Sequence, residues 1–314
     1  MLKLKYLEEN FDLARYALAN WRHDGETLAD RLKWFRISSN AVYPFDRNGK
    51  RCFLRLSPVE ERSKTELLGE IDFLEYLNTH GYPAACPIPT EQGERLLVLD
   101  TPWGKWYASA FRGVPGKQLE DIPMTDALAE AYGGALGRLH SLSMGYESPV
   151  PRRTEQDVLK WTRHVFETHG MPANILASLD ETARRLAELS HGLNRYGLIH
   201  YDFEPDNVFW DGKTCSAIDF EDGMLHFYDM DVAVALEELP EPQRKPFLRG
   251  YRGECPNAIV EERDFPLMRR FHDIYALGRL LHSLSEKPMQ EPEWMPQLTA
   301  YLENEIQVLK KRIE

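Results

Sequence analysis

The sequence predicts an α+β protein of two lobes, a small N-terminal lobe built on an antiparallel sheet and a mainly helical C-terminal lobe. Three observations support this fold class. Strand-like segments crowd into the first third of the 314 residues, helical periodicity dominates the rest, and the turn-forming stretch Phe111–Gly116 separates the two parts. We therefore expect residues 1–111 to form a nucleotide-binding lobe and residues 112–314 a catalytic and acceptor-binding lobe.

The first lobe begins with a helix and continues with strands. Apolar residues three and four positions apart predict a helix over Leu7–Trp21. Trp34–Ile37 and Ala41–Phe45 have the composition of strands, and the turn pair Asn48-Gly49 leads into a third strand, Cys52–Leu56. This pattern predicts the start of an antiparallel sheet.

A long helix and two more strands complete the first lobe. Ser57-Pro58-Val59-Glu60 matches a capping box with proline at the first helical position, so we expect a helix from there to about Asn78. Gly81 and Pro83 end it. Leu96–Leu99 and Lys105–Phe111 are the remaining predicted strands.

The second lobe has one short strand-like region, Asn207–Phe220, among helices. In the first of these helices, Ala127–Ser143, the small residues Gly133, Gly134 and Gly137 indicate close packing against a neighbour. The other predicted helices are Glu155–Thr168, Leu179–His191, Phe265–Ser285 and Met295–Arg312.

Composition narrows the class of partner. The formal net charge of −12 argues against a nucleic-acid or anionic-membrane surface, since phosphate groups need a basic footprint. The four cysteines are scattered without zinc-ligand spacing, and the chain starts without an apolar leader. We therefore expect a reduced, cytoplasmic protein.

The most informative segment runs from His200 to Phe220. Asp211-Gly212 predicts a hairpin turn between two apolar strands, with Asn207 just before the outgoing strand and Asp219 just after the returning one. An antiparallel pair brings those two residues side by side, and Asp202 lies on the loop that leads into it. Any one of these residues alone is a common turn former. Together they supply the hard oxygen ligands of Mg²⁺ and an aspartate near them, as phosphoryl transfer requires.

This segment resembles a known family. His200–Asn207 is similar to the catalytic loop of the aminoglycoside-phosphotransferase/choline-kinase superfamily, relatives of protein kinases, and Ile218-Asp219-Phe220 resembles its metal-binding strand end. The resemblance implies a protein-kinase-like fold and a kinase that uses ATP and Mg²⁺, with Asp202 as the catalytic base or the residue that orients the hydroxyl, and Asn207 and Asp219 as metal ligands. It implies that Asp231 supports the catalytic loop, and we expect His200 to position the loop as well.

The first lobe contains matching features with two departures. Glu70 falls on an apolar helix stripe and needs a cationic partner. By resemblance that partner lies on the third strand and contacts the nucleotide phosphates, and here it is Arg55 where much of the family has lysine. The turn Ser38-Ser39-Asn40 stands where a glycine-rich loop is usual, so the phosphates would be bound by backbone groups and these side chains.

The acceptor is predicted to be the hydroxyl group of a small molecule. Between Asp219 and Asp231 there is no room for a protein-kinase activation segment. Residues 203–262 contain 14 acidic and 5 basic side chains, which favours an amine-bearing acceptor such as an amino alcohol, a hydroxy-amino acid or an aminoglycoside. A solvated acidic surface would produce the same count. Phe247–Arg252 resembles the homoserine-kinase-like branch.

Two rival functions remain at this stage. A catalytically inactive, nucleotide-binding regulator would be consistent with Arg55 in place of lysine, although Asp202, Asn207 and Asp219 are all present. A protein kinase on the same fold is the other alternative.

Overall fold

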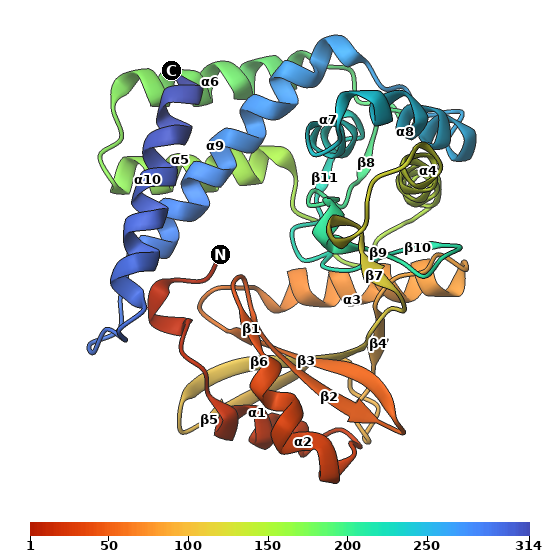
Figure 1. Ribbon diagram of the computed structural model, residues 1–314. Helices are drawn as coiled ribbons and strands as arrows, with labels where there is room; N and C mark the ends of the chain where they lie inside the picture. The colour runs from red at the N-terminus through yellow and green to blue at the C-terminus, as the bar shows by residue number, and fades with distance from the viewer.

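The computed structural model describes residues 1–314 and has the predicted two-lobed α+β architecture (Figure 1). The N-terminal part carries a six-stranded antiparallel sheet, and the C-terminal part is mainly helical. The long helix α3 lies between the sheet and the helical lobe (Figure 1). The exact division at residues 111 and 112 stays a prediction.

The sheet follows the order β1-β2-β3-β6-β4, with β5 paired to the other end of β6. Asn48 and Gly49 form the β2–β3 turn with φ of 53° and 69°, as the turn pair predicted. The strand β4 was not predicted, because three residues interrupted by Pro87 give no periodic signal. The strand bounds are β1 (Arg36–Ile37), β2 (Ala41–Arg47), β3 (Lys50–Pro58), β4 (Cys86–Ile88), β5 (Leu97–Thr101) and β6 (Gly104–Arg112).

The N-terminal helix is shorter than predicted. Only α1 (Phe11–Leu18) is α-helical, Leu4–Tyr6 forms a single 3₁₀ turn, and a second helix, α2 (Gly25–Arg31), follows. The apolar positions of the predicted helix are nevertheless buried. Leu13, Ala14 and Leu18 pack with Tyr43 and other sheet residues in a separate core of 17 side chains.

The predicted start of the long helix was wrong. Ser57 and Pro58 belong to β3, where they pair with Tyr107 and Trp106 of β6. The helix α3 (Lys64–Thr79) starts six residues later than the first motif suggested. Its capping box consists of Ser63 and Glu66, because this second Ser-x-x-Glu motif lies where the strand has ended.

The C-terminal part contains all the predicted helices and two more, α7 and α8, which were not predicted. The helix bounds are α4 (Asp126–Ser143), α5 (Glu155–Thr168), α6 (Ala173–Glu188), α7 (Asp229–Glu237), α8 (Glu241–Glu254), α9 (Phe265–Leu284) and α10 (Met295–Ile313). Short antiparallel pairs complete it: β7 (Lys117–Gln118), β9 (Val208–Trp210) and β10 (Cys215–Ala217) form one sheet, and β8 (Tyr196–Leu198) and β11 (Leu225–Phe227) another.

Helices α4 and α8 of the C-terminal lobe pack with their backbones in close contact. A Cβ added to Gly133 would lie 1.9 Å from the Phe247 carbonyl oxygen, and one on Gly137 would lie 2.4 Å from that of Tyr251. The expectation of close packing is therefore confirmed at these two positions. At Gly134 the nearest atom is 3.6 Å away, so that glycine is not required by packing. No helix of the fold is both long and apolar enough to cross a bilayer.

Candidate functional site

The hairpin formed by β9 and β10 brings the predicted site residues to one edge. Val208 pairs with Ala217, and the Ile218 N–H donates to the Asn207 carbonyl oxygen at 3.0 Å. The Asn207 amide nitrogen donates to a carboxylate oxygen of Asp202 at 3.0 Å and to its carbonyl oxygen at 3.1 Å. This leaves the amide oxygen of Asn207 for another partner, with Asp219 just beyond the returning strand.

The loop before the hairpin is held by the buried carboxylate of Asp231. One of its oxygens accepts from the Tyr201 N–H at 2.7 Å, and the other accepts from the His200 N–H at 2.8 Å and contacts His140 Nε2 at 3.0 Å. Tyr201 has a φ of 73°, a left-handed conformation that is unusual for a residue with a side chain. Asp231 thus fixes the backbone of the residue before Asp202, as predicted for a supporting aspartate.

His200 is also part of this scaffold. Its Nε2 lies 2.9 Å from the carbonyl oxygen of Ile218, so Nε2 carries the proton, and Nδ1 accepts from the Asp202 N–H at 3.3 Å. Burial lowers the pKa of this imidazole, which favours its neutral form. The ring therefore connects the catalytic loop to the strand that leads into Asp219, and both of its nitrogens are engaged within the protein.

The carboxyl group of Asp202 lies partly buried in a negative environment. Burial raises its pKa to about 6, the nearby carboxylates of Asp222, Asp206 and Glu221 also raise it, and Arg279 opposes them. Asp202 is consequently ionised above about pH 6, where it can accept a proton.

The side chain of Asp219 is exposed to solvent at the end of the hairpin. The protein around its carboxyl group raises the pKa of this group above the ordinary value, and the charges of Glu221 and Asp202 add to this effect. No set of three or more His, Cys, Asp or Glu side chains is grouped closely enough to hold a metal ion by itself. The donor set fits Mg²⁺, which takes few protein ligands and completes its shell with phosphates and water.

The predicted pairing in the first lobe is confirmed. Both terminal nitrogens of Arg55 donate to the Glu70 carboxylate, each at 2.7 Å, and the two side chains are buried. The guanidinium also lies 4.7 Å over the ring of Phe111. Its Nε has no hydrogen-bond partner, so this donor remains besides the second N–H of each terminal nitrogen. The planar guanidinium thus links β3 to α3, and the bidentate geometry explains how arginine replaces lysine in the pairing.

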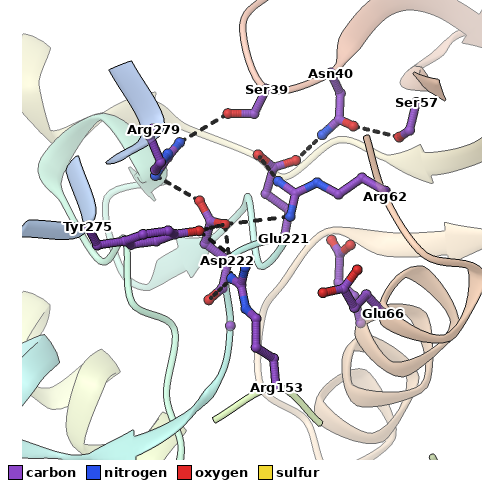
Figure 2. Close-up of polar contacts among 12 residues, drawn as sticks. Ser39, Asn40, Ser57, Arg62, Glu66, Arg153, Glu221, Asp222, Tyr275 and Arg279 are labelled. Atoms are coloured by element: carbon purple, nitrogen blue, oxygen red, sulfur yellow. Dashed lines mark hydrogen bonds and ion pairs between the residues drawn. The ribbon is translucent and has the colours of Figure 1, made fainter. Parts of the chain in front are cut away.

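The turn between β1 and β2 reaches the opposite lobe. Ser39 Oγ accepts from Arg279 of α9 at 3.2 Å, and the Ser38 carbonyl oxygen accepts from the Leu2 N–H at 2.8 Å. The Asn40 side chain is occupied, because it accepts from Ser57 at 2.5 Å and donates to Glu221. The turn is therefore close to Glu221, two residues after Asp219, and Figure 2 shows Ser39 next to Arg279 and Asn40 next to Glu221.

Sequence reasoning missed a group of arginines beside the site. Figure 2 shows Arg62, Arg153 and Arg279 pointing toward the adjacent carboxylates Glu221 and Asp222. They come from the β3–α3 connection, from the residue pair before α5, and from α9. These segments are far apart in the sequence, so the arginines give no common signal. Only the acidic pair Glu221-Asp222, directly after Ile218-Asp219-Phe220, could have indicated that basic side chains gather there.

A cavity of about 350 Å³ borders the catalytic loop at Glu204, Pro205 and Asp206. Four carboxylates line it: Glu120, Glu204, Asp206 and Glu238. We call it the acidic pocket. Burial raises the pKa of Glu204 to about 8, and the neighbouring charges of Asp202, Glu238 and Asp206 contribute. At neutral pH Glu204 is therefore largely protonated, and the pocket is less negative than its composition indicates.

Comparison with known proteins identifies the family. The sequence model described as "Phosphotransferase enzyme family" matches residues 36–265. Amicoumacin kinase of Bacillus subtilis is 25% identical over 213 residues, an alignment that covers 66% of this chain and 62% of that protein. Homoserine kinase of a Caulobacter species is 29% identical over 239 residues, covering 68% of this chain and 69% of the relative.

Two solved structures have the same fold over nearly the whole chain. An amicoumacin kinase in complex with AMP-PNP and Ca²⁺ superposes with a TM-score of 0.75 at 20% identity, covering 95% of this chain and 93% of that one. A microcompartment-associated aminopropanol kinase gives a TM-score of 0.70 at 21% identity, with 96% and 97% covered.

Proposed function

This chain belongs to the phosphotransferase enzyme family, and we propose from that premise that it transfers the γ-phosphate of ATP, with Mg²⁺, to a hydroxyl group of a small molecule. The observation that carries the proposal is the contact of Asn207 with Asp202 at the edge of the hairpin that leads into Asp219. A supporting observation is that relatives named as amicoumacin, homoserine and aminopropanol kinases share the sequence or the fold. One of these folds was solved with AMP-PNP and Ca²⁺.

In the proposed reaction, Asp202 holds the acceptor hydroxyl in line with the γ-phosphorus and takes its proton. The oxygen–phosphorus bond to the acceptor forms while the bond to the β–γ bridging oxygen breaks, and ADP leaves. Mg²⁺, bound by Asn207 and Asp219, would neutralise the phosphate charge. The chain itself contributes mainly position, since Asp231 and His200 fix the loop that carries Asp202.

We assign nucleotide binding to the first lobe, residues 1–111, and acceptor binding to residues 112–314. Arg55, oriented by Glu70, would contact the nucleotide phosphates with one of its remaining donors. The turn Ser38-Ser39-Asn40 would cover the phosphates mainly through its backbone, because the Asn40 side chain is already engaged. We also propose a cytoplasmic location, which agrees with four free cysteines, three of them buried.

The acceptor is proposed to carry an amine, as an amino alcohol, a hydroxy-amino acid or an aminoglycoside does. The acidic pocket, which borders the catalytic loop at Glu204 and Asp206, supports this choice because its field attracts cations.

The direct test is ADP release by the purified protein with Mg·ATP across hydroxylated acceptors of these classes, with Asp202→Asn as the control. We expect acceptor-dependent release that the substitution abolishes. Nucleotide binding without turnover on any acceptor would instead support the inactive regulator, and transfer to a protein would support the protein-kinase alternative.

A further inference from the structure

A cavity of about 560 Å³ lies between the β1–β2 turn and the helical lobe. Four arginines line it: Arg62, Arg152, Arg153 and Arg279. We call it the arginine pocket. The aromatic side chains of Trp161 and Tyr275 form part of its wall, packed edge to face with their ring centroids 5.8 Å apart. The pocket therefore combines a rigid wall with guanidinium groups from three separate segments of the chain.

The arginines outnumber the carboxylates that they contact. Asp222 forms ion pairs with Arg279 at 2.8 Å, Arg153 at 3.2 Å and Arg62 at 3.6 Å, and Arg62 also contacts Glu221 at 3.1 Å (Figure 2). Asp222 is only 2% exposed, so these charges lie in a region of weak solvent screening. Three guanidinium groups thus share two carboxylates, and one positive charge is left over.

Arg152 adds a fourth positive charge without an acidic partner. Its Nη2 donates to the Gly223 carbonyl oxygen at 3.2 Å, and its Nη1 is buried with no hydrogen bond. Burial lowers the pKa of this guanidinium, and the charges of Glu70 and Glu66 oppose this effect only in part. Counted by direct ion pairs, the four arginines of the pocket therefore have two carboxylate partners.

The other carboxylates of the pocket form contacts elsewhere. Glu66 and Asp157 belong to the capping boxes of α3 and α5. Glu61 pairs with His282 at 2.7 Å, and Glu60 accepts from Tyr6 at 2.7 Å. None of the four forms an ion pair or hydrogen bond with the pocket arginines. The pocket therefore contains positive and negative side chains that are not paired with each other. This arrangement suits a ligand that carries both a carboxylate and an amine.

The pocket borders the proposed site of transfer. Arg279 donates to Ser39 of the β1–β2 turn, and among the surrounding charges it acts most strongly on Asp202. Tyr275 packs against Tyr201, the residue before Asp202, with ring centroids 5.3 Å apart. A ligand in the arginine pocket therefore lies next to the catalytic loop and the turn assigned to the phosphates.

We propose that the arginine pocket binds a carboxylate of the acceptor, so that hydroxy acids, and among the amine-bearing classes the hydroxy-amino acids, are the substrates. This inference rests on the proposed kinase function. Arginine is suited to the role because its planar fork binds carboxylates with two parallel hydrogen bonds. An incoming carboxylate would neutralise charge that the folded chain leaves uncompensated.

The test compares matched acceptors that differ only at the carboxylate, for example a hydroxy-amino acid and its carboxamide. We expect kcat/KM of the wild-type enzyme to be about 10- to 100-fold higher for the acid, the scale of a charge-assisted bidentate contact. Arg153→Gln should raise KM for the acid about tenfold, leave KM for the carboxamide unchanged and preserve kcat, and Arg153→Lys should restore part of the preference. Arg249→Gln, which removes an exposed arginine paired with Glu130, is the matched control.

The outcomes separate the two proposals. Equal kcat/KM for acid and carboxamide, or equal losses on both in Arg153→Gln, would overturn the carboxylate site while leaving the kinase intact. No transfer to any acceptor would overturn the proposed function itself. Sulfate at constant ionic strength provides a further arm: it should compete with the acid and not with the carboxamide. Activation by sulfate of transfer to both acceptors would instead identify the ligand as a free anion and reject the proposal.

Discussion

Two pockets near the catalytic loop differ in composition. The arginine pocket is lined by four arginines and five carboxylates, whereas the acidic pocket is lined by four carboxylates and no basic side chain. They also differ in how their charges are held. Three of the four arginines form ion pairs with Asp222, whereas none of the four acids forms an ion pair and Glu204 is largely neutral at pH 7.

A count along the sequence does not show how the charges are distributed in space. Residues 203–262 hold 14 acidic and 5 basic side chains, which favoured an amine-bearing acceptor. Arg62, Arg153 and Arg279 all lie outside that range, yet they surround one of its buried acids, Asp222. The fold thus brings positive charge from three other segments next to this carboxylate.

The largest effect that we expect is on the carboxylate of the catalytic loop, Asp202, near which both pockets lie. Asp202→Asn should lower kcat about 10²- to 10⁴-fold, the usual contribution of a general base, with either acidic or amine-bearing acceptors. The measurement is ADP release at saturating Mg·ATP. Asp211→Asn in the exposed hairpin turn is the matched control and should keep the wild-type rate. Near wild-type turnover of Asp202→Asn would remove the catalytic assignment and with it the reason to compare the pockets.

The second largest effect that we expect is a loss of stability when Asp231, which holds the catalytic loop, is replaced. Asp231→Asn replaces one acceptor oxygen by a donor facing the N–H groups of His200 and Tyr201, so at least one buried donor loses its partner. We expect a loss of about 3 kcal/mol in the free energy of unfolding, measured by urea denaturation. Unchanged stability would mean that the loop does not depend on this carboxylate.

Features of the fold and the site that depend on residues close together in the sequence could be predicted. Features that depend on contacts between distant segments could not. Asp202, Asn207 and Asp219 lie within 18 residues, and the Asp211-Gly212 turn between them fixes their relation, so the sequence sufficed. The start of α3 was mispredicted because two Ser-x-x-Glu motifs follow each other. Only the pairing of Ser57 with Tyr107 of β6 decides between them.

The arginine pocket could not be predicted for the same reason. It requires the approach of α9 to the β1–β2 turn, which depends on the packing of both lobes, and isolated arginines give no signal of their own. The Arg55–Glu70 pair was predictable because an acid on an apolar helix face requires a partner, and the resemblance to the family indicated Arg55 of the third strand as that partner.

A smaller effect concerns the protonation of the acidic pocket. The folded-state pKa of Glu204 is raised to about 8, so the folded protein favours the protonated acid. Below the ordinary pKa of a glutamate the side chain is protonated in both the folded and the unfolded state, so its burial does not reduce the free energy of unfolding through ionisation. As the pH rises from about 4.5 to 8, the unfolded chain ionises first and stability is lost.

Glu204→Gln should therefore stabilise the protein at pH 8 and above, by on the order of 1 kcal/mol, and leave its stability at pH 4.5 unchanged. Melting temperatures measured across this range test the prediction, with the exposed Glu241→Gln as the control. A difference that stays constant with pH would show that folding does not shift the pKa of Glu204 and that this acid is ionised at neutral pH.

The smallest expected effect decides whether the acidic pocket acts on the acceptor at all. Glu238 is exposed at the rim of this pocket, so its charge is screened and would influence an amine mainly through the long-range field. Glu238→Gln should raise KM for an amine-bearing acceptor about twofold at low ionic strength, and the effect should vanish in 1 M salt. A hydroxy acid without an amine should be unaffected, and Glu254→Gln on the far end of α8 is the control. A loss of tenfold or more that persists in salt would place the amine in direct contact with the acidic pocket. No change for any acceptor would leave those carboxylates as a solvated surface, and the arginine pocket alone would then define the acceptor.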